Sequence, residues 1–124
     1  MEQNLVFEVM KKDQPIAKIE LHKNTGEVTK TLFSDYFLDI SQVDSIVDVS
    51  GLNDWFESRC FLRSRADKDI LLEGLGLKEY NPFHIVKISR GAMFEDHYWI
   101  RFEGEEHLVW DDVNPREIGD LRGR

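Results

Sequence analysis

The chain has 124 residues, a formal net charge of −8, 41% hydrophobic residues and 32% charged residues. This length and balance predict a single folded domain over residues 1–124, and they exclude an intrinsically disordered chain. No apolar run approaches the roughly 20 residues of a membrane-spanning helix, and residues 1–4 have neither the basic nor the apolar part of a signal peptide.

The first third of the chain predicts antiparallel β-strands. Residues 5–9 and 16–21 alternate between apolar and polar side chains, and the polar residues 11–15 between them indicate a hairpin turn. Residues 24–26 predict a second turn, and residues 27–33 a third strand. Residues 34–50 follow neither the strand period nor the helix period. There we expect a loop that packs its aromatic side chains, followed by a short strand or turn.

The middle of the chain predicts about three helices. Ser50 is a suitable N-cap for the first, which carries Leu52, Trp55, Phe56 and Arg59. Ser64 is the expected cap of the second, which Gly76 ends and whose apolar stripe consists of Leu71, Leu72 and Leu75. Pro82 predicts the first turn of a third helix, which ends at Gly91.

The last third predicts a β-hairpin and a tail. Tyr98, Ile100 and Phe102 alternate with Trp99, Arg101 and Glu103, residues 104–106 form a turn, and residues 107–110 return as the second strand. Residues 115–124 are predicted to be a frayed tail. The predicted fold class is therefore α+β, with antiparallel strands at the N-terminus, a central cluster of about three helices and a C-terminal β-hairpin.

Residues 52–114 also carry a series of short motifs. The series comprises Leu52, Trp55, Arg59, Arg65, Gly91, Asp96, Tyr98, Trp99, Ile100, Trp110, Asp112 and Asn114. It resembles the N-terminal module of HipA-like kinases of Firmicutes, and short stand-alone proteins of the same type that are often encoded on mobile elements. Leu62 departs from the pattern, since the family usually has proline there. The kinase motifs for phosphate and metal are missing, so the resemblance implies a regulatory or docking module without catalytic residues.

Charge is distributed unevenly along the chain. Residues 1–57 hold 11 acids and 5 bases, residues 58–90 hold 4 acids and 7 bases, and residues 91–124 hold 9 acids and 4 bases. One interpretation is that the basic centre and the acidic flanks pair within the fold. The other is that the flanks form an acidic surface that docks on a basic partner.

The sequence predicts no metal, cofactor or catalytic residue, and hence no enzyme. The four histidines lack the spacing of metal ligands. The predicted hairpin sets Asp96 near Asp112, an arrangement that can hold Mg²⁺, although turn and capping roles are commoner for such residues. Cys60 lies beside three aromatic residues and is expected to be a buried hydrophobe. As the only cysteine it has no internal disulfide partner, which indicates a reducing, cytoplasmic location.

Two residue groups are candidates for recognition. The basic centre consists of Arg59, Arg63, Arg65, Lys68, Lys87 and Arg90. It can contact phosphate, or Arg59 and Arg65 can form salt bridges with Asp54, Glu57, Asp96 or Asp112; we favour the salt bridges. Tyr98 and Trp99 face opposite sides of one strand, so we expect one of them to be exposed and to be the first candidate for a binding hot spot.

The leading hypothesis is a non-enzymatic acidic interaction module, encoded on a phage or mobile element, that binds and regulates a protein such as a kinase-like toxin. The first alternative is an inhibitor of a nucleic-acid enzyme, such as an anti-CRISPR or anti-restriction protein that mimics DNA. The second is a small nucleic-acid binder using residues 59–68, which the acidic flanks disfavour. The candidate partner-binding residues are Tyr98, Trp99, Glu105, Glu106, Asp111, Asp112, Arg63 and Lys68.

Overall fold

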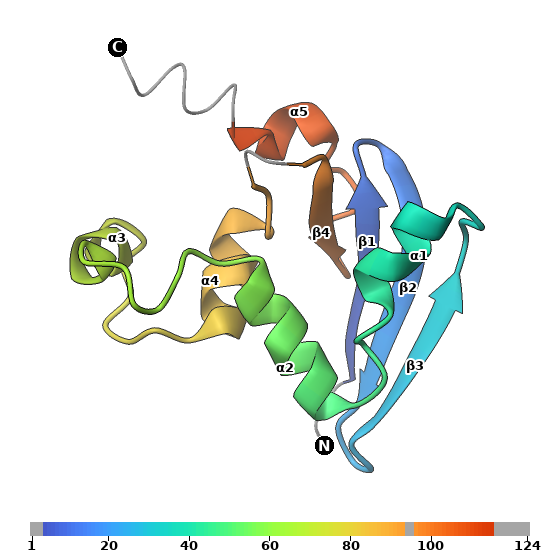
Figure 1. Ribbon diagram of the computed structural model, residues 1–124. Coiled ribbons are helices and arrows are strands. Elements are labelled where there is room, and N and C mark those ends of the chain that lie inside the picture. Colours follow the sequence, from blue (N-terminus) through green and yellow to red (C-terminus); the bar gives the residue numbers. More distant parts are fainter. Residues whose placement is uncertain (1–3, 94–95, 116–124) are drawn as a thin grey trace.

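The computed structural model describes residues 4–93 and 96–115. In it, helices pack against a four-stranded antiparallel sheet (Figure 1). The strands are β1 (Leu5–Lys11), β2 (Gln14–His22), β3 (Glu27–Leu32) and β4 (Tyr98–Phe102). The helices are α1 (Phe37–Val43), α2 (Val49–Ser58), α3 (Lys68–Gly74), α4 (Pro82–Ser89) and α5 (Trp110–Val113). The strand order is β3-β2-β1-β4, and the predicted α+β class is confirmed. No helix within these residues has the length and hydrophobicity needed to cross a bilayer.

The main core lies between one face of the sheet and the helices α1, α2 and α4. Alternate strand residues point into it, as the period of two requires. Phe7 of β1 is central: its ring lies 6.0 Å from Trp55, 5.5 Å from Phe56 and 5.8 Å from Phe102. In β2 the register with β1 shifts between Val9 and Met10, and both Ile16 and Ala17 are buried in this core.

A smaller cluster lies on the other face of the sheet. Met10 and Trp99 follow and precede core residues in their strands, so their side chains point to the opposite face. Trp110 and Val113 of α5 cover them. One end of the sheet is therefore buried on both faces.

The predicted C-terminal hairpin is wrong. β4 pairs with β1, in a register that sets Phe102 opposite Phe7 and Ile100 opposite Val9. Residues 107–110 form no strand beside β4, and Trp110 begins α5 instead. The reason is packing: β4 joins the sheet beside β1 with Tyr98, Ile100 and Phe102 in the main core, while Trp99 on its other face packs with Trp110 in the smaller cluster. The backbone N–H of Trp110 donates to Asp13 Oδ1 (2.7 Å), which holds α5 at the β1–β2 turn.

The loop expected over residues 34–50 contains a helix, α1. Its buried residues are Asp39 and Val43, which are spaced by four and share one helix face. Asp39 accepts hydrogen bonds from the Tyr98 hydroxyl (2.6 Å) and from Ser34 Oγ (2.8 Å). A carboxylate on the inward face interrupts the apolar period, so the pattern did not indicate a helix.

The central helices form as predicted, with different N-caps for two of them. Asp48, and not Ser50, caps α2, and its side chain accepts from the Gly51 N–H at 2.7 Å. Ser64 lies in a turn before α3, whose N-cap is Asp67. Pro82 occupies the first turn of α4 as expected. Apart from residue 115, the predicted frayed tail lies outside the described residues.

Candidate functional site

Tyr98 and Trp99, the first candidates for an exposed hot spot, are both buried. Their exposed fractions are 8% and 1%. The Tyr98 hydroxyl donates to Asp39, and the Trp99 indole N–H donates to the carbonyl oxygen of Lys12 at 2.6 Å. The expectation that one of them faces solvent is wrong, because β4 is covered by the main core on one face and by α5 on the other.

Arg59 acts as a structural clamp. Its side chain is 5% exposed, and its guanidinium binds both carboxylate oxygens of Asp96 at 2.8 and 2.9 Å. It also donates to the carbonyl oxygens of Gly91 (2.9 Å) and Tyr98 (2.7 Å). Burial acts to raise the pKa of Asp96, but the hydrogen bonds and charge of Arg59 outweigh it and lower that pKa below its usual value. The predicted pairing of Arg59 is confirmed.

Other cations of the basic centre also bind groups within the fold. Arg65 pairs with Asp67 at 2.6 Å, and not with any of the four acids predicted for it. Arg63 pairs with Glu57 at 3.1 Å and lies over the Tyr80 ring. Arg90 forms a two-pronged pair with Glu105, and Lys87 lies over the Phe102 ring. Lys68 is half-buried at the start of α3. Arg59 and Arg90 are therefore held in internal pairs, whereas the pairs of Arg63 and Arg65 are exposed and weak.

The predicted acidic candidates have different environments. Glu105 is held by Arg90, and Asp112 accepts a hydrogen bond from the Val109 N–H at 2.9 Å. Glu106 and Asp111 are exposed. The expected approach of Asp96 to Asp112 rested on a hairpin that does not form. Within residues 4–93 and 96–115, no group of three or more histidine, cysteine or acidic side chains is placed to hold a metal ion.

Cys60 is buried, as the sequence predicted. Its thiol lies 3.2 Å from the carbonyl oxygen of Phe56. Burial, with a smaller contribution from the charge of Glu57, raises the pKa of the thiol to about 12. Because the thiolate is the nucleophilic form, Cys60 is inert at neutral pH.

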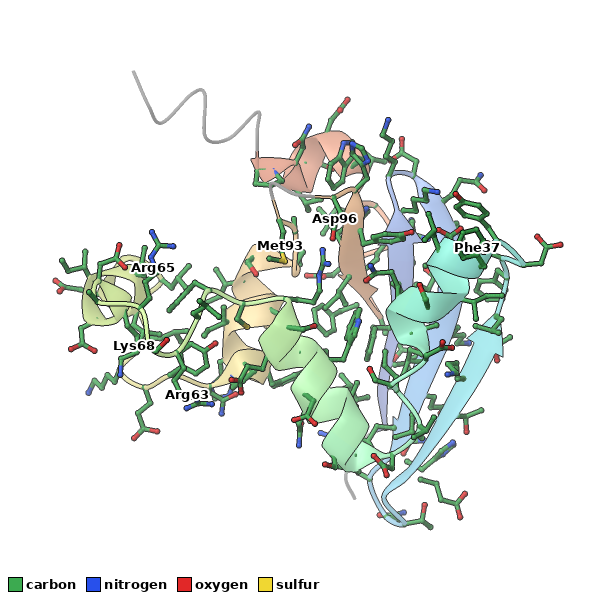
Figure 2. All side chains as sticks on the ribbon, viewed as in Figure 1. Phe37, Arg63, Arg65, Lys68, Met93 and Asp96 are labelled. Atoms are coloured by element: carbon green, nitrogen blue, oxygen red, sulfur yellow. The ribbon has the colours of Figure 1, made fainter. Side chains whose placement is uncertain are left out.

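Sequence reasoning missed a surface that we name the β3–α1 patch. It consists of the exposed side chains Leu32, Phe33, Tyr36, Phe37 and Leu38. Phe37 is 69% exposed and lies at the start of α1, on the side of the sheet where β3 lies (Figure 2). The Tyr36 and Phe37 rings meet edge to face at 5.3 Å. The loop expected over residues 34–50 would bury its aromatic residues. Because α1 turns Asp39 and Val43 inward instead, Tyr36 and Phe37 remain exposed.

The surroundings of the patch are acidic. Residues 27–50 contain five acids and a single base, Lys30. The ammonium group of Lys30 donates to the Val43 carbonyl oxygen at 2.9 Å, which ties it to the fold. Lys11 reaches the patch from β1, where it lies over the Tyr36 ring and 3.4 Å from Asp39. The patch therefore combines exposed aromatic groups with a local excess of negative charge.

A groove lies between the end of α2, α3 and α4. Its volume is about 790 Å³, and its lining includes Phe61, Leu62, Ile70, Leu71, Leu75, Ile85 and Met93. Met93 lies beside α4 and Arg65 near α3 (Figure 2). Leu62 and Ile70 are 73% and 72% exposed. The groove is apolar, but its charged lining residues Glu57, Arg59 and Arg65 are of both signs and favour no partner charge.

Comparisons with protein-family models, with curated proteins and with solved structures find no match for this chain. The resemblance to the N-terminal module of HipA-like kinases therefore stays a prediction. The candidate site rests on the molecule's own geometry.

Proposed function

We propose that this protein is a non-enzymatic, cytoplasmic interaction module that binds a basic protein partner through the β3–α1 patch. One observation carries the proposal: adjacent large apolar side chains, Phe37 foremost, are exposed within an acidic segment. Exposed apolar groups that gather on a small protein are candidates for a binding site. The acidic surroundings select a partner of opposite charge.

The helix beneath the patch is anchored to the sheet through Asp39. Asp39 anchors α1 to β4 through Tyr98 and receives Lys11 as well. Burial acts to raise the pKa of Asp39, but these partners and Ser34 lower it overall, so Asp39 stays ionised at neutral pH. The backbone of α1 beneath the aromatic rings is thus tied to the sheet. Aromatic anchors commonly contribute about 2 kcal/mol or more each when a partner covers them.

Two classes of partner satisfy this chemistry. A kinase-like toxin with a basic docking face is the one that the resemblance implies. A nuclease with a basic DNA channel is the other, and it would make the protein an anti-CRISPR or anti-restriction inhibitor carried by a phage or mobile element. The nucleic-acid-binder alternative is disfavoured, because Arg59 and Arg90 are held in internal pairs and the acidic segments of the chain repel phosphate.

The test is capture of the partner by the wild-type protein and by two matched variants. Phe37→Ser removes the main patch residue, and Ile70→Ser removes an equally exposed residue of the groove. We expect Phe37→Ser to weaken binding of the captured partner by at least tenfold, or about 1.4 kcal/mol. Ile70→Ser should leave the affinity unchanged. Equal affinities of wild type and Phe37→Ser would overturn the proposal.

Further measurements on the purified complex test the charge argument and identify the class of the partner. Binding that weakens as salt rises supports the charge argument. If DNA cleavage by a captured nuclease stops when the protein is added, the partner is a nuclease. If phosphorylation by a captured kinase changes instead, the partner is a kinase. Direct binding of DNA, lost on Arg63→Ala and retained by Phe37→Ser, would place the function in the basic centre and reject the patch.

A further inference from the structure

The two edges of the sheet differ in how they are covered. At the β4 edge, the Ile100 N–H donates to the Arg90 carbonyl oxygen at 2.7 Å, and the Arg59 guanidinium donates to the Tyr98 carbonyl oxygen. At the β3 edge, no other strand of the described residues lies outside β3 (Figure 1). An uncovered edge strand is a template for pairing with another chain, and proteins usually blunt such edges.

β3 shows few of the usual blunting devices. Its six residues pair with β2 in an uninterrupted register, so the strand has no bulge toward β2, and it contains no proline. Lysine on an edge strand often serves to block pairing. Here the Lys30 ammonium group is turned inward to the Val43 carbonyl oxygen. Val28, Thr29 and Thr31 are residues that favour extended backbone.

The register shows which backbone groups of β3 have no partner strand among the described residues. Phe33 N donates to the Ile16 carbonyl oxygen at 2.9 Å, in step with the β2–β3 pairs. Bonded and non-bonded residues alternate along an antiparallel pair. Thr31, Thr29 and Glu27 therefore direct their N–H and C=O groups toward β2. Those of Val28, Lys30 and Leu32 point away from the sheet.

Apolar side chains border both ends of this edge. Phe33 and Phe37 of the patch lie at its C-terminal end. Val49 lies at its N-terminal end, where a Cβ on Gly26 would be 4.0 Å from Val49 Cγ2, and the neighbouring Val47 is exposed as well. Glu27, the first residue of β3, and Asp35, three residues beyond its last, are both exposed. An extended segment along β3 would meet apolar groups and carboxylates together.

We infer that β3 is the docking edge, and that the partner adds an extended segment rich in lysine or arginine and β-branched residues as a fifth strand. This inference rests on the proposed function and specifies its binding mode. Backbone hydrogen bonds to Val28, Lys30 and Leu32 fix the register of the added strand. Alternate side chains of that strand reach the patch. A second copy of the chain is the less suitable occupant, since each copy carries a net charge of −8 and like charges would meet.

The probe is an octapeptide of alternating lysine and valine, acetylated and amidated, with an octapeptide of alternating glutamate and valine as its control. We expect binding of the lysine peptide only. Hydrogen exchange of the Val28, Lys30 and Leu32 amides, measured by NMR, should slow at least tenfold in the complex. The Thr29 and Thr31 amides already face β2 and should change little.

Two variants of Leu32 separate the contribution of its backbone N–H to peptide binding from that of its side chain. Leu32→Pro removes an outward N–H, whereas Leu32→Ala keeps it. We expect Leu32→Pro to weaken peptide binding at least tenfold more than Leu32→Ala, because both variants lose the patch side chain and only the proline variant loses the outward N–H. A hydrogen-exchange map of each free variant confirms that the sheet is intact.

Several outcomes would overturn strand addition. If the lysine peptide fails to bind, or binds without protecting the outward amides, strand addition is wrong. The proposed function still stands in that case if the captured partner depends on Phe37. If sedimentation shows a dimer that protects the same amides without peptide, the occupant is a second copy and the basic partner is rejected at this edge.

Discussion

Arg59 and Asp96 meet through two parallel hydrogen bonds of 2.8 and 2.9 Å, which join the C-terminal end of α2 to the segment leading into β4. The same guanidinium binds the carbonyl oxygens of Gly91 and Tyr98. One side chain thus connects α2, the end of α4 and the outer edge of β4. This connection closes one edge of the sheet and leaves β3 as the open one.

Replacing Arg59 should destabilise the fold strongly. Arg59→Ala leaves the partly buried Asp96 and two carbonyl oxygens without their donor, and we expect a loss of about 3 kcal/mol in the free energy of unfolding. Urea denaturation measures this loss. Arg65→Ala is the matched control, because its pair with Asp67 is exposed and should contribute at most about 1 kcal/mol. Equal losses for the two variants would contradict the structural role of Arg59.

Stability should fall in acid. Asp96 and Asp39 both have pKa values below the ordinary 3.8, because their hydrogen bonds and cationic neighbours outweigh burial. A carboxylate whose pKa is lower in the folded state stabilises the fold above its unfolded pKa. That stability is lost as the pH falls through the folded pKa. The free energy of unfolding should therefore begin to drop below about pH 5 and keep falling below 3.8.

Asp96→Asn tests which carboxylate is responsible for the acid sensitivity. The free-energy difference between wild type and Asp96→Asn should be largest at neutral pH and should shrink in acid, where the wild-type carboxyl also becomes protonated. Urea denaturation at several pH values measures it. A difference that stays constant from neutral to acidic pH would show that the charge of Asp96 contributes nothing.

Two glycines in helices should respond oppositely to alanine. At Gly51 a Cβ would lie 1.9 Å from the Ser45 carbonyl oxygen, so Gly51→Ala must displace the α1–α2 connection. We expect a loss of more than about 2 kcal/mol. At Gly74 a Cβ meets nothing within 4 Å, and Gly74→Ala should stabilise α3 by up to about 1 kcal/mol. Thermal denaturation of both variants measures these changes in stability. A Gly51→Ala variant as stable as the wild type would contradict the close approach of residue 51 to the Ser45 carbonyl oxygen.

Cys60 should react with thiol reagents only when the protein opens. Burial raises the pKa of its thiol to about 12, so the thiolate is scarce at neutral pH and the sulfur is covered. Labelling with a disulfide reagent should be slow in buffer and fast in denaturing urea. Rapid labelling of the folded protein would show that the α2–α4 interface opens readily.

The N-terminal strands and the middle helices could be predicted because their signals are local. Strands β1 and β2 show the period of two, and β3 follows a glycine turn at Gly26. Asn81 and Pro82 specify the start of α4 through cap chemistry that involves only neighbouring residues. Burial of Cys60 followed from its aromatic neighbours.

The predictions are wrong where contacts with residues far away in the sequence determine the structure. Helix α1 places Asp39 inward because Tyr98, 59 residues later, donates to it. Strand β4 pairs with β1, although residues 107–110 are closer along the chain. The exposure of Tyr98 and Trp99 was misjudged for the same reason, since α5 covers a face that a hairpin would have left open.

The sequence by itself determined the α+β class, the short-range strands and helices, the acidic character and the burial of Cys60, because period, capping and composition act between neighbouring residues. The tertiary structure alone decided which side of β4 is paired, which arginine is buried and which aromatic residues remain in solvent. Those outcomes depend on contacts across the chain: Arg59 with Asp96, Tyr98 with Asp39, and β4 with β1. They leave Phe37 and the edge of β3 exposed together, a relationship that no local pattern encodes.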